Sequence, residues 1–253
     1  MDLINKLKNI VRSQPPVWSG DYSSWEEASA KCANYSDRSI LEKVRKALIE
    51  VKEGRAAFER DSVLFYEPDY NWPMLSALLY AFANENGRLN VIDFGGSLGS
   101  TYFQHRAWFK PFQYTWNVVE QEHFVEAGRV DFQSDQLKFH NQIEEAASSQ
   151  ATFLLLSSVL AYLPDPYDWM NKLLSQNYKY VFIDRTPLIS GKDRLTIQQV
   201  PKEIYEASYP SWFFNEQKFM TAITKKYKLF ASVDCVETAD FPSNFKGHFL
   251  TLA

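Results

Sequence analysis

The chain is poor in cysteine and in histidine. Its two cysteines, Cys32 and Cys235, lie far apart and form no CxxC or other metal-ligand spacing. They predict two reduced thiols in a cytoplasmic protein, with a single disulfide as the alternative. Three of the four histidines, His123, His140 and His248, show no ligand-like spacing with carboxylates. We therefore predict no metal site.

The chain also lacks a strong excess of charge and a long apolar run. Its 27 basic and 31 acidic residues are interspersed, and the net charge is −4. Because no basic stripe is present, we do not expect a nucleic acid as partner. No segment approaches the roughly 20 apolar residues of a membrane span. The amphipathic residues 1–13 lack the apolar core of a secretory signal and predict a helix packed on the domain, with an interfacial helix as the alternative.

Apolar residues make up 45% of the chain and aromatic residues 16%, which argues against disorder. The length of 253 residues suits one large domain, or one domain with an N-terminal appendage. The N-terminal third shows helical spacing, with helices predicted over 24–35, 39–56 and 74–87. The first of these opens with a capping box formed by Ser24 and Glu27.

From residue 89 onward, predicted strands alternate with predicted helices. The strands are expected at 89–94, 114–120, 137–140, 151–159, 179–185, 228–237 and 247–253. Such alternation predicts a parallel sheet covered on both faces, and the last two strands, with no helix between them, predict an antiparallel hairpin. The count and order are those of the class I methyltransferase fold, a Rossmann-like α/β fold with a seven-stranded, mostly parallel sheet. We predict an N-terminal helical extension over 1–88, packed on a cofactor-binding domain over 89–253.

A glycine-rich turn follows the first predicted strand, where mononucleotide-binding sheets place their ligands. Gly95, Gly96 and Gly99 let the backbone turn tightly and approach a ligand closely. With Asp93 they follow the D/E-x-G-x-G-x-G pattern of class I methyltransferases, except that Ser97 replaces the middle glycine. An acid there suits the amino group and sulfonium of S-adenosylmethionine and disfavours a diphosphate. We predict that these residues bind S-adenosylmethionine; the alternative is a tight turn with no ligand.

Polar residues at the next strand ends extend this predicted site. Glu120 ends the second strand, where a carboxylate can accept hydrogen bonds from a ribose diol. Asn141 follows the third strand and is expected near adenine from its position in the fold. Ser157 and Ser158 end the fourth strand and are expected to line the methionine half of the cofactor or the acceptor. A dinucleotide loop, GxGxxG, would need glycine at Ser97 and therefore fits poorly.

Methyl transfer requires the acceptor in line with the methyl–sulfur bond, and an alcohol acceptor also needs a general base. Asp184 and Arg185 end the fifth predicted strand and are candidate catalytic residues. The alternative for this pair is a structural salt bridge. His105, on the helix after the glycine turn, is a candidate base, although a histidine there is more often packed or on the surface.

Two segments are candidates for the acceptor side. The first is a long irregular insert after the fifth strand. We expect it to be an ordered lid, although half its aromatics could be core residues. Its aromatic residues are Tyr205, Tyr209, Trp212 and Phe213. Tyr209 and Trp212, together with Tyr162 after the fourth strand, are predicted to bind the acceptor. The second segment, over 59–70, carries Glu59, Arg60, Asp61, Tyr66 and Tyr70. With the N-terminal helices it would cap the acceptor, extend the cover of the sheet or form a dimer interface.

Long strings spread over nearly the whole chain resemble a methyltransferase family that is named after a Leptospira prototype and encoded in polysaccharide-biosynthesis loci. These strings are GDYSSWEEA (20–28), ERDSVLF (59–65), VIDFGGSLGSTYFQHR (91–106), WNVVEQEHFVEAG (116–128), LLLSSVLAYLPDP (154–166), FIDRTPL (182–188) and QQVPKEIYEASYPSWFFNE (198–216). The resemblance implies a class I fold and the use of S-adenosylmethionine. The location of the encoding loci implies a sugar hydroxyl as acceptor.

We therefore expect a methyltransferase that converts S-adenosylmethionine to S-adenosylhomocysteine. Its expected partner is a small hydroxylated acceptor, a sugar or a polysaccharide precursor, with a second copy of the chain as a further candidate. One alternative is a non-catalytic protein of the same fold that serves a biosynthetic complex. The other is a nucleotide-dependent oxidoreductase, which Ser97 and the terminal hairpin disfavour.

Overall fold

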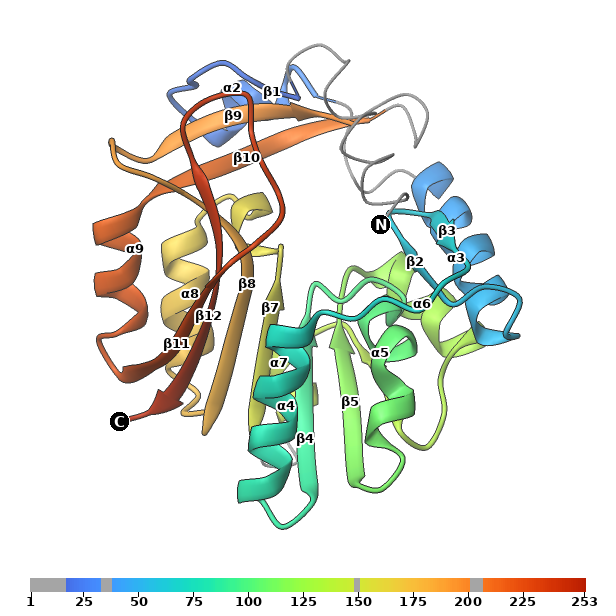
Figure 1. Cartoon of the computed structure of the whole chain (residues 1–253). Helices are drawn as coiled ribbons and strands as arrows, with labels where there is room; N and C mark the ends of the chain where they lie inside the picture. The colour runs from blue at the N-terminus through green and yellow to red at the C-terminus, as the bar shows by residue number, and fades with distance from the viewer. Residues whose placement is uncertain (1–16, 33–37, 148–150, 201–206) are drawn as a thin grey trace.

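A central sheet organises the structure, which is a computed structural model. It describes residues 17–32, 38–147, 151–200 and 207–253. Five parallel strands run in the order β6-β5-β4-β7-β8. Their bounds are β4 Arg88–Phe94, β5 Gln113–Val119, β6 Leu137–His140, β7 Phe153–Ser157 and β8 Tyr180–Ile189. β12 (Asn244–Leu252) pairs antiparallel with β8, and β11 (Tyr227–Asp234) pairs antiparallel with β12 (Figure 1). The predicted fold class, a mostly parallel sheet with a terminal antiparallel hairpin, is confirmed.

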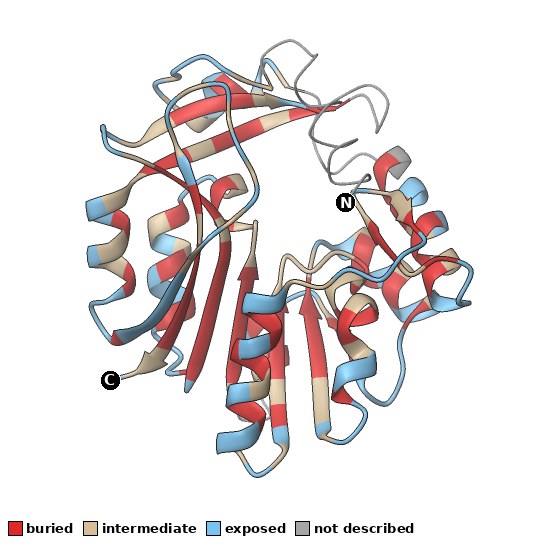
Figure 2. Ribbon diagram, viewed as in Figure 1, coloured by how far each residue is buried: buried red, intermediate tan, exposed pale blue. Residues whose placement is uncertain are grey.

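Apolar side chains leave the central strands on both faces. Along β4, Val91 belongs to the apolar cluster on one face and Ile92 to the cluster on the other. Phe182 and Ile183 of β8 divide in the same way. Successive side chains in a strand point to opposite faces, so a continuous apolar run requires cover on both. The core strands are accordingly buried over most of their length (Figure 2).

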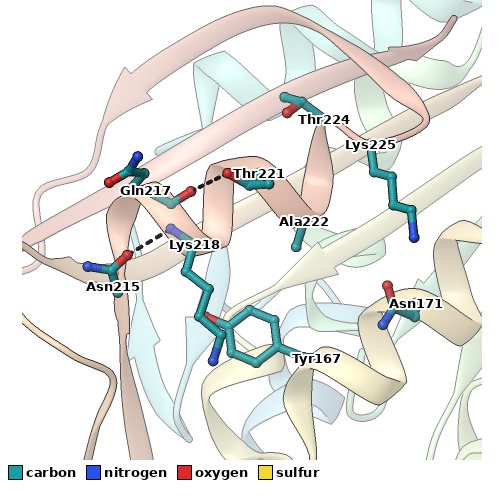
Figure 3. A pocket seen from close by; sticks show the side chains of 9 residues that line it. All are labelled: Tyr167, Asn171, Asn215, Gln217, Lys218, Thr221, Ala222, Thr224 and Lys225. Atoms are coloured by element: carbon teal, nitrogen blue, oxygen red, sulfur yellow. Dashed lines mark hydrogen bonds between the residues drawn. The ribbon is translucent and has the colours of Figure 1, made fainter.

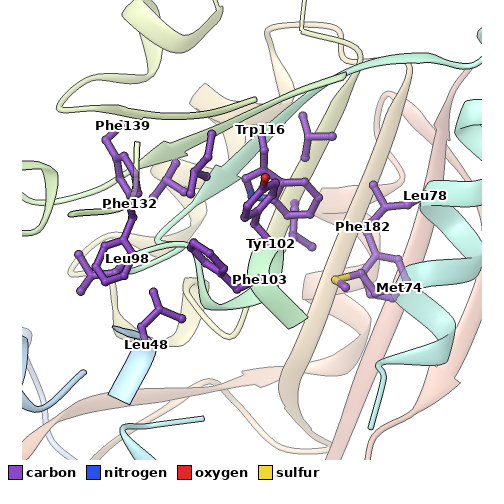
Figure 4. Close-up of a cluster of buried hydrophobic side chains, with 14 of the residues drawn as sticks. Leu48, Met74, Leu78, Leu98, Tyr102, Phe103, Trp116, Phe132, Phe139 and Phe182 are labelled. Carbon is purple, nitrogen blue, oxygen red and sulfur yellow. The ribbon is translucent and has the colours of Figure 1, made fainter. Parts of the chain in front are cut away.

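Helices cover the two faces of the sheet. The first face carries α4 (Trp72–Asn84), α5 (Ser100–His105) and α6 (Glu122–Asp131), with α3 (Arg38–Lys52) packed outside α5 and α6. The second face carries α7 (Ile143–Ala147), α8 (Pro166–Leu174) and α9 (Glu216–Ile223). Two short 3-10 helices, η1 (Arg106–Phe109) and η2 (Leu160–Tyr162), follow α5 and β7. Figure 4 shows the first face, where Leu48 of α3 and Met74 of α4 join the aromatic core around Trp116.

The N-terminal third contains the predicted helices and, in addition, short strands; the first two helices end earlier than predicted, at Ser29 and Lys52. Ser24 caps α2 (Trp25–Ser29) as predicted: its hydroxyl accepts a hydrogen bond from the Glu27 amide at 3.2 Å. The Glu27 carboxylate, which a capping box would bond to the Ser24 amide, instead accepts from the amide of Ser23 at 3.2 Å. The other two predicted helices are α3 and α4. The segment between them forms a hairpin of β2 (Phe58–Arg60) and β3 (Val63–Phe65). Three residues per strand are too few for a period-2 pattern, so the sequence did not indicate this hairpin.

The insert after the fifth strand is regular, and the prediction of an irregular stretch was wrong. It forms the antiparallel strands β9 (Arg194–Gln199) and β10 (Ser208–Asn215), and β1 (Trp18–Ser19) pairs with β9. Pairing with so distant a segment leaves no local pattern in the sequence. Figure 1 shows this layer above the carboxyl ends of β7 and β8. Tyr205 and the amphipathic residues 1–13 lie outside the described residues.

Other predictions can be compared directly with the fold. Cys32 and Cys235 are free thiols, as predicted. Within the described residues, no helix is long and apolar enough to cross a membrane. No group of three metal-ligating side chains occurs within the same part of the chain.

Candidate functional site

The glycine-rich turn lies where β4 passes into α5, at the carboxyl edge of the sheet. Gly95 and Gly99 have φ of +74° and +91°, which favour glycine, and Ser97 adopts the same hand at 54°. A Cβ added to Gly96 would lie 2.5 Å from the carboxyl carbon of Asp93. Ser97 therefore adopts a left-handed conformation that favours glycine, and the turn has no room for a side chain at Gly96.

Asp93 lies directly beneath this turn. Its side chain is 1% exposed, and its Oδ2 accepts a hydrogen bond from the indole Nε1 of Trp116 at 3.0 Å. Burial raises the pKa of Asp93 to about 7, and the hydrogen bond from Trp116 opposes this rise. A buried carboxyl with so raised a pKa is typical of functional sites, since burial of a charge is costly without a compensating partner.

Glu120 follows β5 and lies against the same turn. Its carboxylate accepts hydrogen bonds from the backbone amide of Gln121, at 2.7 Å, and from that of Ser97. Burial raises the pKa of Glu120 to about 7, and these two hydrogen bonds oppose the rise. The structure thus brings together the acid and the glycine turn, which the sequence separates by a helix and a strand.

A cavity of about 230 Å³ opens beside these acids. Its lining residues are Phe94, Val119, Asn141, Gln142, Ile143, Glu144, Trp169 and Lys172. Phe94 and Val119 end β4 and β5, and Asn141 follows β6, so three neighbouring strand ends form one wall. The rings of Phe94 and Trp169 lie 5.4 Å apart. Asn141, predicted to bind the cofactor, lines this cavity, whereas Trp169, on a helix remote in sequence, had no signal that could have revealed it.

The carboxyl ends of β7 and β8 form the other half of the carboxyl edge of the central sheet. Ser157 pairs with Asp184 in the sheet register, and its hydroxyl donates to Asp184 Oδ2 at 3.3 Å. The side-chain amide of Asn71 donates to the same oxygen at 2.7 Å. Asp184 is 3% exposed, and the Arg185 Nε lies 3.7 Å from its carboxylate. Protein groups therefore already bind the Asp184 carboxylate, and the sequence did not point to Asn71.

Arg185 and Ser158 hold unusual backbone conformations beside Asp184. Their φ angles are 51° and 59°, in the left-handed region that residues with a Cβ seldom adopt. Such strain persists where the surrounding structure imposes it, and it concentrates at functional sites. The Arg185 guanidinium donates to the Ser157 hydroxyl at 3.0 Å. It also experiences the charge of Asp61, in the turn between β2 and β3.

His105 is buried and bonded on both ring nitrogens. Its Nδ1 lies 2.8 Å from the carbonyl oxygen of Thr101, and its Nε2 accepts a hydrogen bond from the backbone amide of Asn71 at 3.1 Å. Burial lowers the pKa of His105 to about 4, so the ring is neutral at pH 7. Both ring nitrogens of His105, a predicted candidate base, therefore already have hydrogen-bond partners within the protein.

The strands β9 and β10 contact the segment after β7. The Tyr162 hydroxyl donates to Gln198 Oε1 at 2.8 Å, and its ring lies edge-on to that of Tyr209 at 5.2 Å. The Trp212 indole donates to the Leu163 carbonyl at 3.2 Å. This hydrogen bond from Trp212 connects β10 to the segment after β7. Burial raises the pKa of the Tyr162 hydroxyl to about 12. The charge of Asp61 also acts on Tyr162, so the hairpin turn lies within electrostatic range of both Tyr162 and Arg185.

A second depression, of about 960 Å³, lies between α8 and α9 and is shown in Figure 3. Its lining residues are Tyr167, Asn171, Asn215, Gln217, Lys218, Thr221, Ala222, Thr224 and Lys225. Lys218 lies 4.0 Å from the centre of the Tyr167 ring and 2.6 Å from Asp193. None of the strand-end residues described above lines this depression, so we assign it no part in the site.

No protein-family model matches the sequence, and no curated protein matches it. Solved structures match the fold. The N-terminal domain of EvdMO1, in the presence of S-adenosylhomocysteine and D-fucose, aligns with a TM-score of 0.52 and 11% identity over 83% of this chain and 97% of that domain. A complex of LepI with S-adenosylmethionine aligns with a TM-score of 0.50 and 15% identity over 74% of this chain and 49% of LepI. Magnesium protoporphyrin IX methyltransferase from Synechocystis PCC 6803, with bound S-adenosylmethionine, gives a TM-score of 0.49 at 13% identity, covering 87% of this chain and all of that one (100%). The strand order, together with the first two alignments, shows that the chain has the class I, Rossmann-like methyltransferase fold.

Proposed function

We propose that the protein is a methyltransferase that uses S-adenosylmethionine and releases S-adenosylhomocysteine. One observation carries the proposal: the glycine turn, two acids with raised pKa and an aromatic cavity lie along one carboxyl edge of the sheet. Ligands of open α/β sheets bind at that edge.

Each part of this edge matches one part of the cofactor. The cavity between Phe94 and Trp169 suits a flat base, and Asn141 at its wall offers both a donor and an acceptor. The carboxylate of Glu120 can accept hydrogen bonds from both hydroxyls of a ribose. The turn at Gly96, with Asp93 beneath it, suits the methionine end with its positive charge. When bound, the cofactor supplies a methyl group already activated by the sulfonium.

We place the acceptor beside Arg185 and Tyr162. Because methyl transfer depends on alignment, a rigid strand end under backbone strain is a suitable place to orient an acceptor. The Asp184 carboxylate and both ring nitrogens of His105 already have hydrogen-bond partners in the protein. We therefore propose that Asp184 positions Arg185 and that His105 positions Asn71.

We further propose a small hydroxylated acceptor, with a sugar or a sugar conjugate as the first class to test. The family resemblance and the EvdMO1 domain described with D-fucose support this choice. An acid and a guanidinium at one place, Asp61 and Arg185, also match the donors and acceptors of a hydroxylated ring.

Two measurements test the function. Calorimetric titration with S-adenosylhomocysteine should show micromolar binding, while NAD, the control ligand, should not bind. Transfer of a radiolabelled methyl group to a panel of free and nucleotide-linked hexoses then tests the reaction. Asp61→Asn should keep cofactor affinity and lose transfer, whereas the exposed Asp135→Asn should keep both. Folded protein that binds no S-adenosylhomocysteine would refute the cofactor, and binding without transfer to any hydroxylated acceptor would favour the non-catalytic alternative.

A further inference from the structure

Glu59, in β2, is a buried carboxylate outside the proposed cofactor site. It is 4% exposed, and its two oxygens bind different partners. Oε2 accepts a hydrogen bond from the backbone amide of Ser62 at 3.0 Å, and Oε1 accepts one from the hydroxyl of Ser100. Burial raises the pKa of Glu59 to about 7, and both hydrogen bonds oppose this rise. A carboxylate is costly to bury unless it is well bonded, so these partners indicate what Glu59 connects.

The first partner of Glu59 lies in the loop of the β2–β3 hairpin. Arg60 pairs with Val63, so Asp61 and Ser62 form a two-residue loop. Their φ angles are 51° and 66°, the hand that tight hairpin loops need but that residues with a Cβ seldom adopt. The hydrogen bond from the Ser62 amide to Glu59 therefore stabilises the loop in a conformation that is costly by itself.

The second partner belongs to the end of the glycine turn. Ser100 is the first residue of α5 and directly follows Gly99, the last glycine of the turn. The position of the Ser100 hydroxyl therefore depends on the conformation of the turn. Glu120 binds the same turn from the end of β5, through the backbone amide of Ser97. Two carboxylates from different elements thus bind the turn, and Glu59 links it to the hairpin.

The chain that leaves the hairpin is bonded to the other end of α5. The side-chain amide of Gln104 donates to the carbonyl oxygen of Asp69 at 2.7 Å. The backbone amide of Asn71 donates to Nε2 of His105 at 3.1 Å, and its side-chain amide donates to Asp184 at 2.7 Å. Figure 1 shows this chain running from the hairpin to the start of α4. The segment therefore has one end at the glycine turn and the other at Asp184.

We propose that Glu59 is a positioning residue that couples the glycine turn to the β2–β3 hairpin, so that a cofactor bound at the turn also fixes the loop with Asp61. This coupling rests on the function proposed above, because it needs S-adenosylmethionine at the turn. Both oxygens of Glu59 are bonded, so it acts through Ser100 and Ser62 and not on the cofactor itself. Asp61 lies within electrostatic range of Arg185, where we place the acceptor. Coupling is reciprocal, so loosening the hairpin weakens cofactor binding by the same factor.

Hydrogen exchange followed by mass spectrometry tests the coupling in the full chain at pH 8, where Glu59 is mostly ionised. Saturating S-adenosylhomocysteine should slow exchange in the wild type over the turn, 94–100, and over the hairpin, 58–65, each about threefold or more. Ser100→Ala removes the hydroxyl that joins them, so it should keep the slower exchange over the turn and lose it over the hairpin. Ser100→Thr keeps a hydroxyl and should behave like the wild type.

Affinity for S-adenosylhomocysteine, measured by calorimetry, provides a second test. Glu59→Gln replaces one of the two acceptor oxygens by an amide nitrogen. Glu59→Gln and Ser100→Ala should each weaken binding about three- to tenfold. The double variant should bind about as weakly as Glu59→Gln alone, because both changes break the same link. Glu67→Gln, the same change at an exposed acid of the same segment, is the matched control and should bind like the wild type.

The outcomes separate the coupling from the proposed function. Binding that slows exchange over the turn but not over the hairpin would overturn the coupling and leave the cofactor in place. Effects of Glu59→Gln and Ser100→Ala that multiply in the double variant would overturn it as well. A folded wild type that binds no S-adenosylhomocysteine would instead refute the proposed function, and the coupling with it.

Discussion

Asp93→Asn should make the protein more stable at alkaline pH while weakening cofactor binding. The carboxyl group of Asp93 is 1% exposed, and burial raises its pKa from 3.8 to about 7. Because the folded pKa lies above the unfolded one, the stability that Asp93 contributes is complete below pH 3.8. It is lost as the pH rises to about 7. Asparagine does not titrate and keeps an acceptor for the Trp116 indole.

The expected magnitude follows from the part of this window between pH 5 and pH 8. Each pKa unit corresponds to about 1.4 kcal/mol, and about two units of the window lie above pH 5. The wild type should therefore lose about 3 kcal/mol of unfolding free energy between these two pH values relative to Asp93→Asn. Any fixed cost of burying an amide cancels in this difference.

Urea unfolding at pH 5 and pH 8, followed by tryptophan fluorescence, measures this change. Asp135→Asn, on an exposed loop, serves as the matched control and should follow the wild type at both pH values. The same variant of Asp93 should bind S-adenosylhomocysteine roughly tenfold more weakly, corresponding to about 1.4 kcal/mol. If Asp93→Asn gains no stability relative to the wild type between pH 5 and pH 8, the burial argument for Asp93 is wrong.

Three further changes test other parts of the edge. Gly96→Ala should abolish S-adenosylhomocysteine binding in calorimetry, because the new Cβ would lie 2.5 Å from the carboxyl carbon of Asp93. The control variant Gly191→Ala, with open space around the new Cβ, should bind S-adenosylhomocysteine normally. Wild-type affinity should rise between pH 6 and pH 8 as Glu120 and Asp93, each with a pKa of about 7, ionise. Glu120→Gln should bind roughly tenfold more weakly at pH 8 and show a smaller rise over this range, because only Asp93 then still ionises. Asn71→Ala removes the N-cap of α4 and a hydrogen bond to Asp184. It should lower the free energy of unfolding, measured by urea titration, by about 2–3 kcal/mol. A change below measurement error would show that neither hydrogen bond contributes to stability.

The predictions made from local patterns agree with the structure. The buried strands, the N-cap at Ser24 and the glycine turn with Asp93 each depend on residues within a few positions of one another. Periodicity and turn chemistry act over such distances, so they remain legible in a single sequence. The order of strands and helices then restricted the topology to one sheet type, because crossover connections between parallel strands allow few arrangements.

The sequence by itself thus determined the elements, the class of sheet and which strand ends carry polar groups. Only the tertiary structure decided what those groups touch: both nitrogens of His105 are bonded, Asn71 reaches Asp184, and a hairpin turn carries Asp61 to Arg185. The pairing of β1 with β9 was likewise decided by the fold. These contacts join segments that are far apart in the chain. They form only when the chain packs, so no local sequence pattern predicts them.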